Sequence, residues 1–169
     1  MDLDEIVVIA LGGNLAGDFV SSEALLEAAV AKLVEAGLPV LARSGWWRSA
    51  AWPDPSGPEY RNGVALVEVN RGPEALLNTL FQVEAAFRRV RDGKNAPRTL
   101  DLDLIAYGRR VQDSPGLVLP HPRAHERLFV MGPLAEVAPG WRHPVLGRTA
   151  AALAAAATVG RDARPVTPR

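Results

Sequence analysis

The sequence contains no cysteine and only two lysines, Lys32 and Lys94, among its 169 residues. The lack of cysteine excludes disulfides, zinc–thiolate sites, iron–sulfur clusters and a thiol nucleophile. Lysine and arginine together number 19 and are balanced by 19 acidic residues, so the chain lacks the basic excess that non-specific nucleic-acid binding needs. We therefore expect no nucleic-acid partner. Almost all the basic residues are arginines, the residue type suited to bidentate phosphate contacts.

Long hydrophobic runs are also missing. The longest apolar stretch, around 150–159, is too short to span a bilayer, and the acidic start MDLDEIVVIALGG is unlike a secretory signal. The sequence thus predicts a cytoplasmic protein with no membrane partner. Its length and its 48% of apolar residues fit one domain with one sizeable core. We expect that domain at 1–160, a loose C-terminal tail at 161–169, and a monomer.

Hydrophobic periodicity predicts an α+β protein. The expected elements are, in chain order, a strand at 6–11, a helix from Ser21 or Ser22 to about Glu35, strands at 39–47 and 62–69, a helix at 73–91 and a strand at 100–107. This βαββαβ order is the ferredoxin-like pattern. A short strand near Val111 and helical segments within 121–139 and 148–159 are expected to follow this core. Many functions share the pattern, so the fold identifies none of them.

The sharpest chemical feature is the segment PRTLDLD, residues 97–103. Asp101 and Asp103 are two residues apart on a predicted strand, so their side chains share one face about 7 Å apart, while the leucines between and beside them face a core. Two carboxylates on a rigid strand suit Mg²⁺, which prefers a few carboxylates together with phosphate oxygens and water. The alternative is a solvated acidic face. Arg98 weakens that alternative, because it could pair with the acids or meet a phosphate that they hold.

Two further clusters carry arginines. Glu84 and Arg89 lie near the end of the second predicted helix, where a helix-stabilising ion pair and the helix dipole explain part of the pattern. His121 and Arg127 belong to the segment PHPRAHER, which is either a rigid turn or a set of donors to a polyphosphate. The sequence leaves both alternatives open. The spacing of the histidines makes a zinc site improbable.

Tyr60 and Asn62 form a possible site for a flat heterocycle. An aromatic ring can stack on such a ligand, and an amide can offer it a donor and an acceptor together. The alternative is that Tyr60 covers a sheet edge. The chain has no phosphate-binding P-loop motif, no dinucleotide-binding glycine fingerprint and no G-x-S-x-G motif, which argues against those enzyme classes.

These motifs together resemble a known family, the 6-hydroxymethyl-7,8-dihydropterin pyrophosphokinases of folate biosynthesis. The resemblance runs from about residue 6 to residue 139 and is most specific in the last two of its segments. These segments are ALGGNL at 10–15, YRN at 60–62, PRTLDLDLIAYG at 97–108 and LPHPRAHERLFVMGPLAEVAP at 119–139. The chain departs from the family in AAW at 50–52, where prolines are common, and this departure affects a loop expected to close over the site.

The resemblance implies a single ferredoxin-like pyrophosphokinase domain that transfers pyrophosphate from ATP to the hydroxymethyl group of 6-hydroxymethyl-7,8-dihydropterin and releases AMP. Two Mg²⁺ ions are implied at Asp101 and Asp103, which with Arg89 and Arg98 are the implied catalytic residues. The residues implied to bind ATP are Glu84, Arg89, Arg98, Leu104, His121 and Arg127. Those implied to bind the pterin are Gly12, Ser49, Trp52, Tyr60, Asn62 and Phe129, with Asn62 at the pterin edge and Tyr60 and Phe129 on either side of its ring.

Three other functions are weighed against this interpretation. Another two-metal enzyme on a ferredoxin-like core, such as a nucleotidyl transferase or cyclase, explains the aspartates and arginines but does not call for Asn62 beside Tyr60. An RNA-binding module needs basic and aromatic residues on its central strands, where this chain has LDLDLIAY. A structural or metal-storage role leaves the arginines unexplained.

Overall fold

The structure is a computed structural model that describes residues 1–14, 16–50, 56–87 and 100–166. Its elements are β1 (Val7–Gly13), α1 (Ser22–Glu35), β2 (Val40–Arg43), β3 (Trp47–Ser49), β4 (Tyr60–Val67), α2 (Pro73–Phe87), β5 (Asp101–Tyr107), β6 (Gln112–Ser114), β7 (Leu117–Leu119), the 3₁₀ helix η1 (Ala124–Glu126), α3 (Leu128–Val137), α4 (Ala150–Ala156) and β8 (Arg164–Pro165). With β2 and β3 taken as one interrupted strand, the first part is βαββαβ. The predicted ferredoxin-like order is confirmed.

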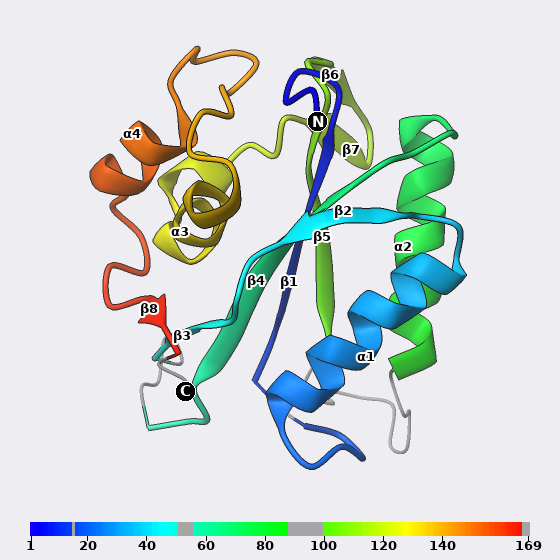
Figure 1. Cartoon of the computed structure of the whole chain (residues 1–169), viewed down its shortest axis with the longest axis vertical. Coiled ribbons are helices and arrows are strands. Elements are labelled where there is room, and N and C mark those ends of the chain that lie inside the picture. The colour runs from blue at the N-terminus through cyan, green and yellow to red at the C-terminus, as the bar shows by residue number, and fades with distance from the viewer. Residues whose placement is uncertain (15, 51–55, 88–99, 167–169) are drawn as a thin grey trace.

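The main sheet is antiparallel and has the order β5-β1-β4-β3-β8, with β2 paired to the other end of β4. Helices α1 and α2 cover one face of this sheet, and α3 and α4 lie on the opposite face (Figure 1). Strand β1 is central and is buried almost throughout, which its apolar sequence VVIALGG allows. No helix in the described part of the chain has the length and apolar character needed to cross a membrane.

Each face of the sheet has its own hydrophobic core. Val7 and Ile9 of β1 point toward α1 and α2, whereas Val8 points toward α3, as the two-residue period of a strand requires. On β5, Leu102 and Leu104 belong to the α1–α2 side, as predicted. The aspartates between and beside these leucines therefore face the α3 side of the sheet.

Helix α1 begins and ends where the sequence predicts. The Ser21 side chain caps the helix by accepting a hydrogen bond from the Ala24 N–H at 3.0 Å. Leu26, Ala29 and Leu33 are fully buried along its inner face. Gly37 follows with a positive φ of 93°, which suits a helix C-terminus because glycine has no Cβ to clash in that conformation.

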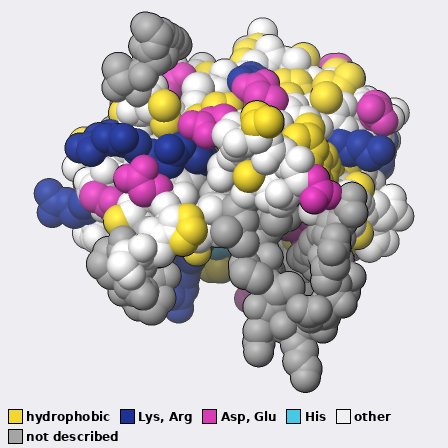
Figure 2. Space-filling model, turned by 90° about the horizontal axis from the view of Figure 1, so that it is seen from below, with side chains coloured by type: hydrophobic (Ala, Val, Ile, Leu, Met, Phe, Trp, Pro, Cys, Tyr) yellow, Lys and Arg dark blue, Asp and Glu magenta, His cyan; other side chains and the backbone are white. Residues whose placement is uncertain are grey.

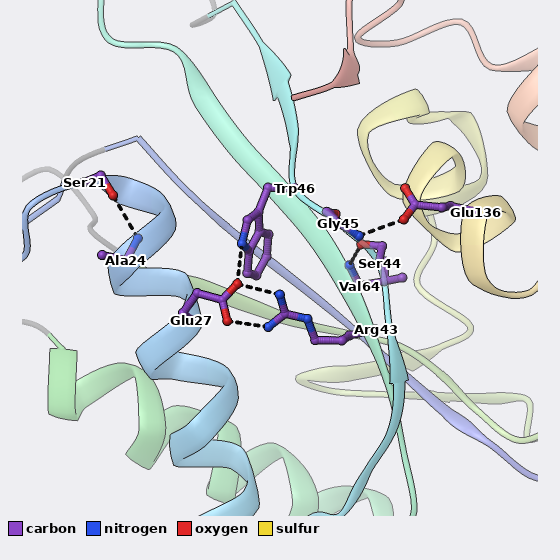
Figure 3. A network of polar contacts seen from close by, with 9 residues as sticks. All are labelled: Ser21, Ala24, Glu27, Arg43, Ser44, Gly45, Trp46, Val64 and Glu136. Atoms are coloured by element: carbon purple, nitrogen blue, oxygen red, sulfur yellow. Dashed lines mark hydrogen bonds and ion pairs between the residues drawn. The ribbon is translucent and has the colours of Figure 1, made fainter. Parts of the chain in front are cut away.

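The predicted single strand at 39–47 is interrupted at residues 44–46, where the Val64 N–H of β4 donates to the Ser44 hydroxyl at 3.0 Å (Figure 3). Trp46 Nε1 donates to Glu27 of α1 at 2.9 Å, and Trp47 Nε1 donates to Glu136 of α3, also at 2.9 Å. The second Glu136 oxygen accepts from the Gly45 N–H at 2.8 Å. At the break between β2 and β3, side-chain oxygens of Ser44 and Glu136 therefore accept from backbone N–H groups, an arrangement that local periodicity does not predict.

The C-terminal segment corrects two expectations. The helix expected within 148–159 is shorter and spans Ala150–Ala156. The tail expected to be loose from residue 161 is instead packed as far as residue 166: β8 pairs with β3, and the Val166 N–H donates to the Trp46 carbonyl at 2.9 Å. Few apolar side chains of this segment are buried, Ala163 among them. Its sequence therefore shows little hydrophobic periodicity from which this packing could be predicted.

Candidate active site

A cleft of about 920 Å³ lies on the α3 side of the sheet, at the end where β1 finishes and β4 and β5 begin. Figure 2 views the molecule from below, toward this end, and shows acidic and basic side chains intermixed there. Six separate stretches of chain contribute to the cleft. Its lining residues are Ala10, Leu11, Gly12, Gly13, Ser49, Ala50, Tyr60, Asn62, Asp101, Asp103, Arg123, Glu126, Arg127, Phe129, Val130, Thr158, Val159, Gly160, Arg161 and Asp162.

Asp101 and Asp103 stand together in the wall of the cleft. Across the β1–β5 pairing, Asp101 lies opposite Gly12 and Asp103 lies opposite Ala10, so small neighbours leave space beside both carboxylates. Their predicted position on one face of a strand is confirmed. Within the described ranges no three His, Cys, Asp or Glu residues gather as a metal site. The two carboxylates in the cleft wall fit Mg²⁺, an ion that proteins commonly hold by one or two carboxylates together with phosphate oxygens and water.

Tyr60 and Asn62 both line the cleft from β4, two residues apart and so on one face of the strand. Asn62 is paired with Gly12, and a Cβ atom on Gly12 would lie 2.5 Å from Asn62 Oδ1. Glycine at this position is thus what leaves room for the Asn62 amide. Ser49 is opposite Tyr60 in the β3–β4 pairing and is 7% exposed.

Arg127 and Phe129 form the opposite wall, at the junction of η1 and α3. The Arg127 guanidinium carbon lies 5.8 Å from the centroid of the Phe129 ring, within cation–π range. Phe129 also packs against Gly160, where a Cβ atom would lie 2.5 Å from the ring. The aromatic ring is therefore held from the side of the C-terminal segment.

His121 lies beside the cleft and does not appear among its lining residues. Burial lowers the pKa of this histidine; the charge of Asp103 acts against that shift, and Arg127 acts with it. Its Nδ1 accepts a hydrogen bond from the Arg123 N–H at 3.1 Å. The neutral ring therefore carries its proton on Nε2, where it can be donated to an oxygen ligand.

Two other predicted ATP-binding residues, Glu84 and Leu104, are absent from the cleft lining. Glu84 is on α2 and is only 7% exposed, and its Oε2 accepts from the Leu102 N–H of β5 at 2.7 Å. Leu104 is 6% exposed in the core shared with α1 and α2. The ATP-binding roles of these residues stay predictions. Arg89, Arg98 and Trp52, together with residues 51–55 of the loop expected to close over the site, lie outside the described residues.

The structure adds lining residues that the motifs did not assign. Arg123 and Glu126 belong to the segment PHPRAHER, which the sequence analysis singled out. Their position near Arg127 in that segment could have predicted that they line the cleft. Residues 158–162 carried no such signal, because nothing in their composition connects them to residues more than a hundred positions earlier.

Comparisons with known proteins agree with this geometry. The family model described as 7,8-dihydro-6-hydroxymethylpterin-pyrophosphokinase (HPPK) matches residues 8–139. A 2-amino-4-hydroxy-6-hydroxymethyldihydropteridine pyrophosphokinase of Synechocystis is 44% identical over 143 residues, which are 84% of this chain and 71% of the relative. The protein of the same description from Pseudomonas aeruginosa is 39% identical over 138 residues, covering 82% of this chain and 83% of that one.

Solved structures share the fold. The crystal structure of wild-type Plasmodium falciparum HPPK-DHPS superposes with a TM-score of 0.68 over 89% of this chain, at 12% sequence identity. The aligned region is 44% of that Plasmodium chain, so this chain spans less than half of it. At such low identity the likeness concerns the α+β ferredoxin-like fold alone.

Proposed function

Because the chain belongs to the 7,8-dihydro-6-hydroxymethylpterin-pyrophosphokinase family, it transfers pyrophosphate to hydroxymethyldihydropterin in folate synthesis, and we propose that it does so in the cleft beside β5. The family uses ATP as a substrate. We propose that ATP donates its β,γ-pyrophosphoryl group here and leaves as AMP. The observation that carries this proposal is that one cleft contains both an acidic pair and a set of aromatic and amide groups.

The pterin is proposed to bind between Tyr60 and Phe129, which approach the cleft from β4 and from α3. Stacked aromatic contacts hold a flat ring, while the Asn62 amide offers the donor and acceptor that a pterin edge needs. Gly12 supports this role because it leaves the Asn62 amide unobstructed. Ser49 is proposed to add a hydroxyl contact from the buried end of β3.

The triphosphate is proposed to bind on the side of Asp101 and Asp103. Those carboxylates would hold two Mg²⁺ ions, which when bound neutralise negative charge on the phosphate oxygens. Arg127 would donate to phosphate oxygens from the facing wall, and the Nε2–H of His121 would donate from beside the cleft, where the His121 backbone is bonded to β5. The predicted roles of Arg89 and Arg98 as further phosphate ligands are part of the same proposal.

The proposed mechanism is one of positioning. The hydroxymethyl oxygen attacks the β-phosphorus in line with the departing AMP oxygen, so the protein has to align two substrates and stabilise charge. The ring site fixes the attacking oxygen, and the arginine and histidine donors stabilise charge where it develops. A site that excludes water protects the β-phosphorus from hydrolysis.

The partners proposed are these two small molecules alone, bound by a cytoplasmic monomer with one pyrophosphokinase domain. The balance of 19 basic and 19 acidic residues supports the expectation that nucleic acid is no partner. Size-exclusion chromatography with light scattering measures the oligomeric state directly. A mass of twice 18.1 kDa would contradict the monomer.

The decisive experiment is an assay of AMP formation from ATP, Mg²⁺ and 6-hydroxymethyl-7,8-dihydropterin. Wild-type protein should form AMP only when the dihydropterin is present. Asp101→Asn and Asp103→Asn should each lower kcat/KM by about 100-fold or more, because each removes a carboxylate that holds charge-neutralising metal. Asp113→Asn, on exposed β6 outside the cleft, is the matched control and should keep full activity.

The same assay separates the rival enzyme class. A nucleotidyl transferase or cyclase on this fold would release pyrophosphate and would not need the dihydropterin. Pyrophosphate release without dihydropterin would overturn the proposal in favour of that class. Failure of the wild-type protein to bind dihydropterin would also overturn it.

A further inference from the structure

The segment after α4, residues 157–166, crosses from α3 and η1 to the edge of the sheet at β3 (Figure 1). We call it the C-terminal strap. It lies beyond residues 8–139, which the family model matches, yet five of its residues line the cleft. A segment that reaches both walls of a binding cleft can set the distance between them.

One end of the strap is tied to the wall that carries Arg127 and Phe129. The N–H groups of Thr158 and Val159 both donate to the Glu126 carbonyl, at 3.0 and 2.9 Å. The Leu128 N–H donates in return to the Val159 carbonyl at 2.9 Å. This end of the strap is thus joined by backbone hydrogen bonds to the residues on either side of Arg127.

The middle of the strap turns against Phe129. Gly160 has a φ of 70°, and the Ala163 N–H donates to the Gly160 carbonyl at 2.9 Å, which closes a tight turn. A Cβ atom at Gly160 would lie 2.5 Å from the Phe129 ring. Glycine therefore serves both the turn and the close approach to the ring.

The other end is tied to the opposite wall. Asp162 Oδ2 accepts a hydrogen bond from the Ala50 N–H at 2.6 Å, directly after Ser49. Beyond it, β8 pairs with Trp47 and Arg48 of β3. Strand β8 has only two residues and β3 only three, so the charge-assisted hydrogen bond from Ala50 to Asp162 adds to a short ladder.

We propose that Asp162 is a positioning residue for the dihydropterin subsite. It acts through Ala50: by holding this backbone N–H it fixes the end of β3 and the buried Ser49 hydroxyl at a set distance from Phe129. The strap then joins the Ser49 wall to the Phe129 wall, in addition to the contact of Trp47 with Glu136 that links β3 to α3. This inference rests on the proposed function, because it concerns the subsite assigned there to the dihydropterin.

The test compares Asp162→Ala with Asp162→Asn in the full-length protein. Alanine removes the acceptor, whereas asparagine keeps an oxygen that can accept from the Ala50 N–H. Asp162→Ala should raise the Kd for 6-hydroxymethyl-7,8-dihydropterin by about 3- to 10-fold, the range expected for losing a partly exposed charge-assisted hydrogen bond. Asp162→Asn should stay within about 2-fold of wild type, and the Kd for Mg-ATP should not change in either variant.

A second readout follows the contact itself. Hydrogen exchange at the Ala50 amide should be faster in Asp162→Ala than in wild type and nearly normal in Asp162→Asn. Ala50→Pro removes the N–H that donates to Asp162. The double variant Ala50→Pro with Asp162→Ala should therefore have a Kd for dihydropterin no higher than that of the single variant with the higher Kd. Additive losses would overturn the inference, because they would mean that the two residues act independently.

Three other outcomes would overturn the inference. Equal losses of dihydropterin and Mg-ATP binding together with a lower Tm would overturn the inference, since they would show a general structural role. Unchanged dihydropterin binding and a still protected Ala50 amide in Asp162→Ala would overturn it while leaving the proposed function intact. If wild-type protein binds no dihydropterin, the proposed function fails first and this inference fails with it.

Discussion

Among single residues, Gly12 shapes the cleft by having no side chain. Gly12 lies opposite Asn62 in the sheet, and the absence of a side chain at Gly12 is what lets the Asn62 amide take its place. The glycine in the motif ALGGNL thus leaves room for a side chain of β4. The sequence shows that a glycine is present, and only the strand pairing shows what the glycine makes room for.

Replacing Gly12 with alanine is expected to weaken dihydropterin binding without unfolding the protein. The new Cβ would lie 2.5 Å from Asn62 Oδ1 and would push the amide out of place. We expect a Kd about 10-fold higher, equivalent to the loss of roughly one good hydrogen bond. Gly72→Ala is the matched control, because a Cβ there meets nothing within 4 Å. If a fluorescence titration gave Gly12→Ala and wild-type protein equal Kd values for dihydropterin, the role assigned to Asn62 would be contradicted.

A second residue-scale prediction concerns acid stability. His143 is 6% exposed; burial, with a smaller contribution from nearby His125, lowers its pKa to about 4. Its Nδ1 accepts from the N–H groups of Val145 and Leu146, so the folded state favours the neutral ring. The unfolded chain takes up this proton near the ordinary value of 6.5. The residue's contribution to stability is therefore complete above pH 6.5 and is lost as pH falls toward 4.

The measurement is urea unfolding of wild type and His143→Asn at pH 7.5 and pH 4.5. The asparagine oxygen keeps an acceptor for the two amides but takes up no proton. Between these two pH values the wild type should lose about 1–3 kcal/mol more unfolding free energy than the variant. Parallel pH profiles for the two proteins would show that His143 does not carry this acid sensitivity.

At the scale of elements, β5 depends on the helix beside it. Strand β5 is at the edge of the sheet, and Glu84 of α2 accepts a hydrogen bond from its Leu102 N–H. Leaving the Leu102 N–H unpaired at this buried position would cost stability. Glu84 therefore pairs a backbone N–H of the edge strand and also holds in place the strand that carries Asp101 and Asp103. A role for Glu84 behind the strand agrees with its burial.

The prediction is that Glu84→Ala is destabilised by about 2–3 kcal/mol, because it leaves the Leu102 N–H unpaired and opens a small cavity. Glu84→Gln retains an acceptor oxygen and should cost about 1 kcal/mol or less. Denaturant unfolding measures both variants. AMP formation should fall further in Glu84→Ala than in Glu84→Gln, in line with displaced aspartates. Equal stability of the two variants would mean that this hydrogen bond contributes little.

Elements also explain where local patterns failed. The run PVLARSGWW predicts one strand at 39–47, yet the structure has β2 and β3 with a break between them. The break lies at Ser44 and Gly45, where the Ser44 hydroxyl accepts from the Val64 N–H and the Gly45 N–H donates to Glu136 of α3 (Figure 3). The two tryptophans that follow the break pack against glycines. A Cβ atom on Gly63 would lie 2.6 Å from the Trp46 ring, and one on Gly132 would lie 2.6 Å from the Trp47 ring. These partners are distant in sequence, so a local pattern cannot predict them.

At the scale of the whole molecule, the cleft lies between the sheet and the layer formed by α3 and the C-terminal strap. The α1–α2 layer supports the back of the sheet, while α3 and the C-terminal strap enclose the front (Figure 1). A ligand that binds this cleft contacts the folded state only, so it should raise the thermal stability of the whole chain.

The corresponding prediction concerns metal removal. A non-hydrolysable ATP analogue with Mg²⁺, at about 100 times its Kd, should stabilise the protein by about 2.7 kcal/mol, which for a chain of this length is a Tm shift of about 5–10 °C. EDTA should abolish most of that shift, as should Asp103→Asn. The shift produced by dihydropterin should persist in EDTA, because that subsite uses no metal. An EDTA-insensitive shift with the analogue would contradict the proposed role of the aspartates.

By itself, the sequence determined the features that depend on neighbours in the chain. Alternation placed Asp101 and Asp103 on one face of a strand, and capping residues marked the ends of α1. The specific motifs also identified the family. The tertiary structure alone decided the contacts between distant residues, among them Gly12 with Asn62 and Ala50 with Asp162, the latter 112 positions apart. The physical reason is that periodicity and capping act within a turn or a strand, whereas such contacts form only when separate elements pack together.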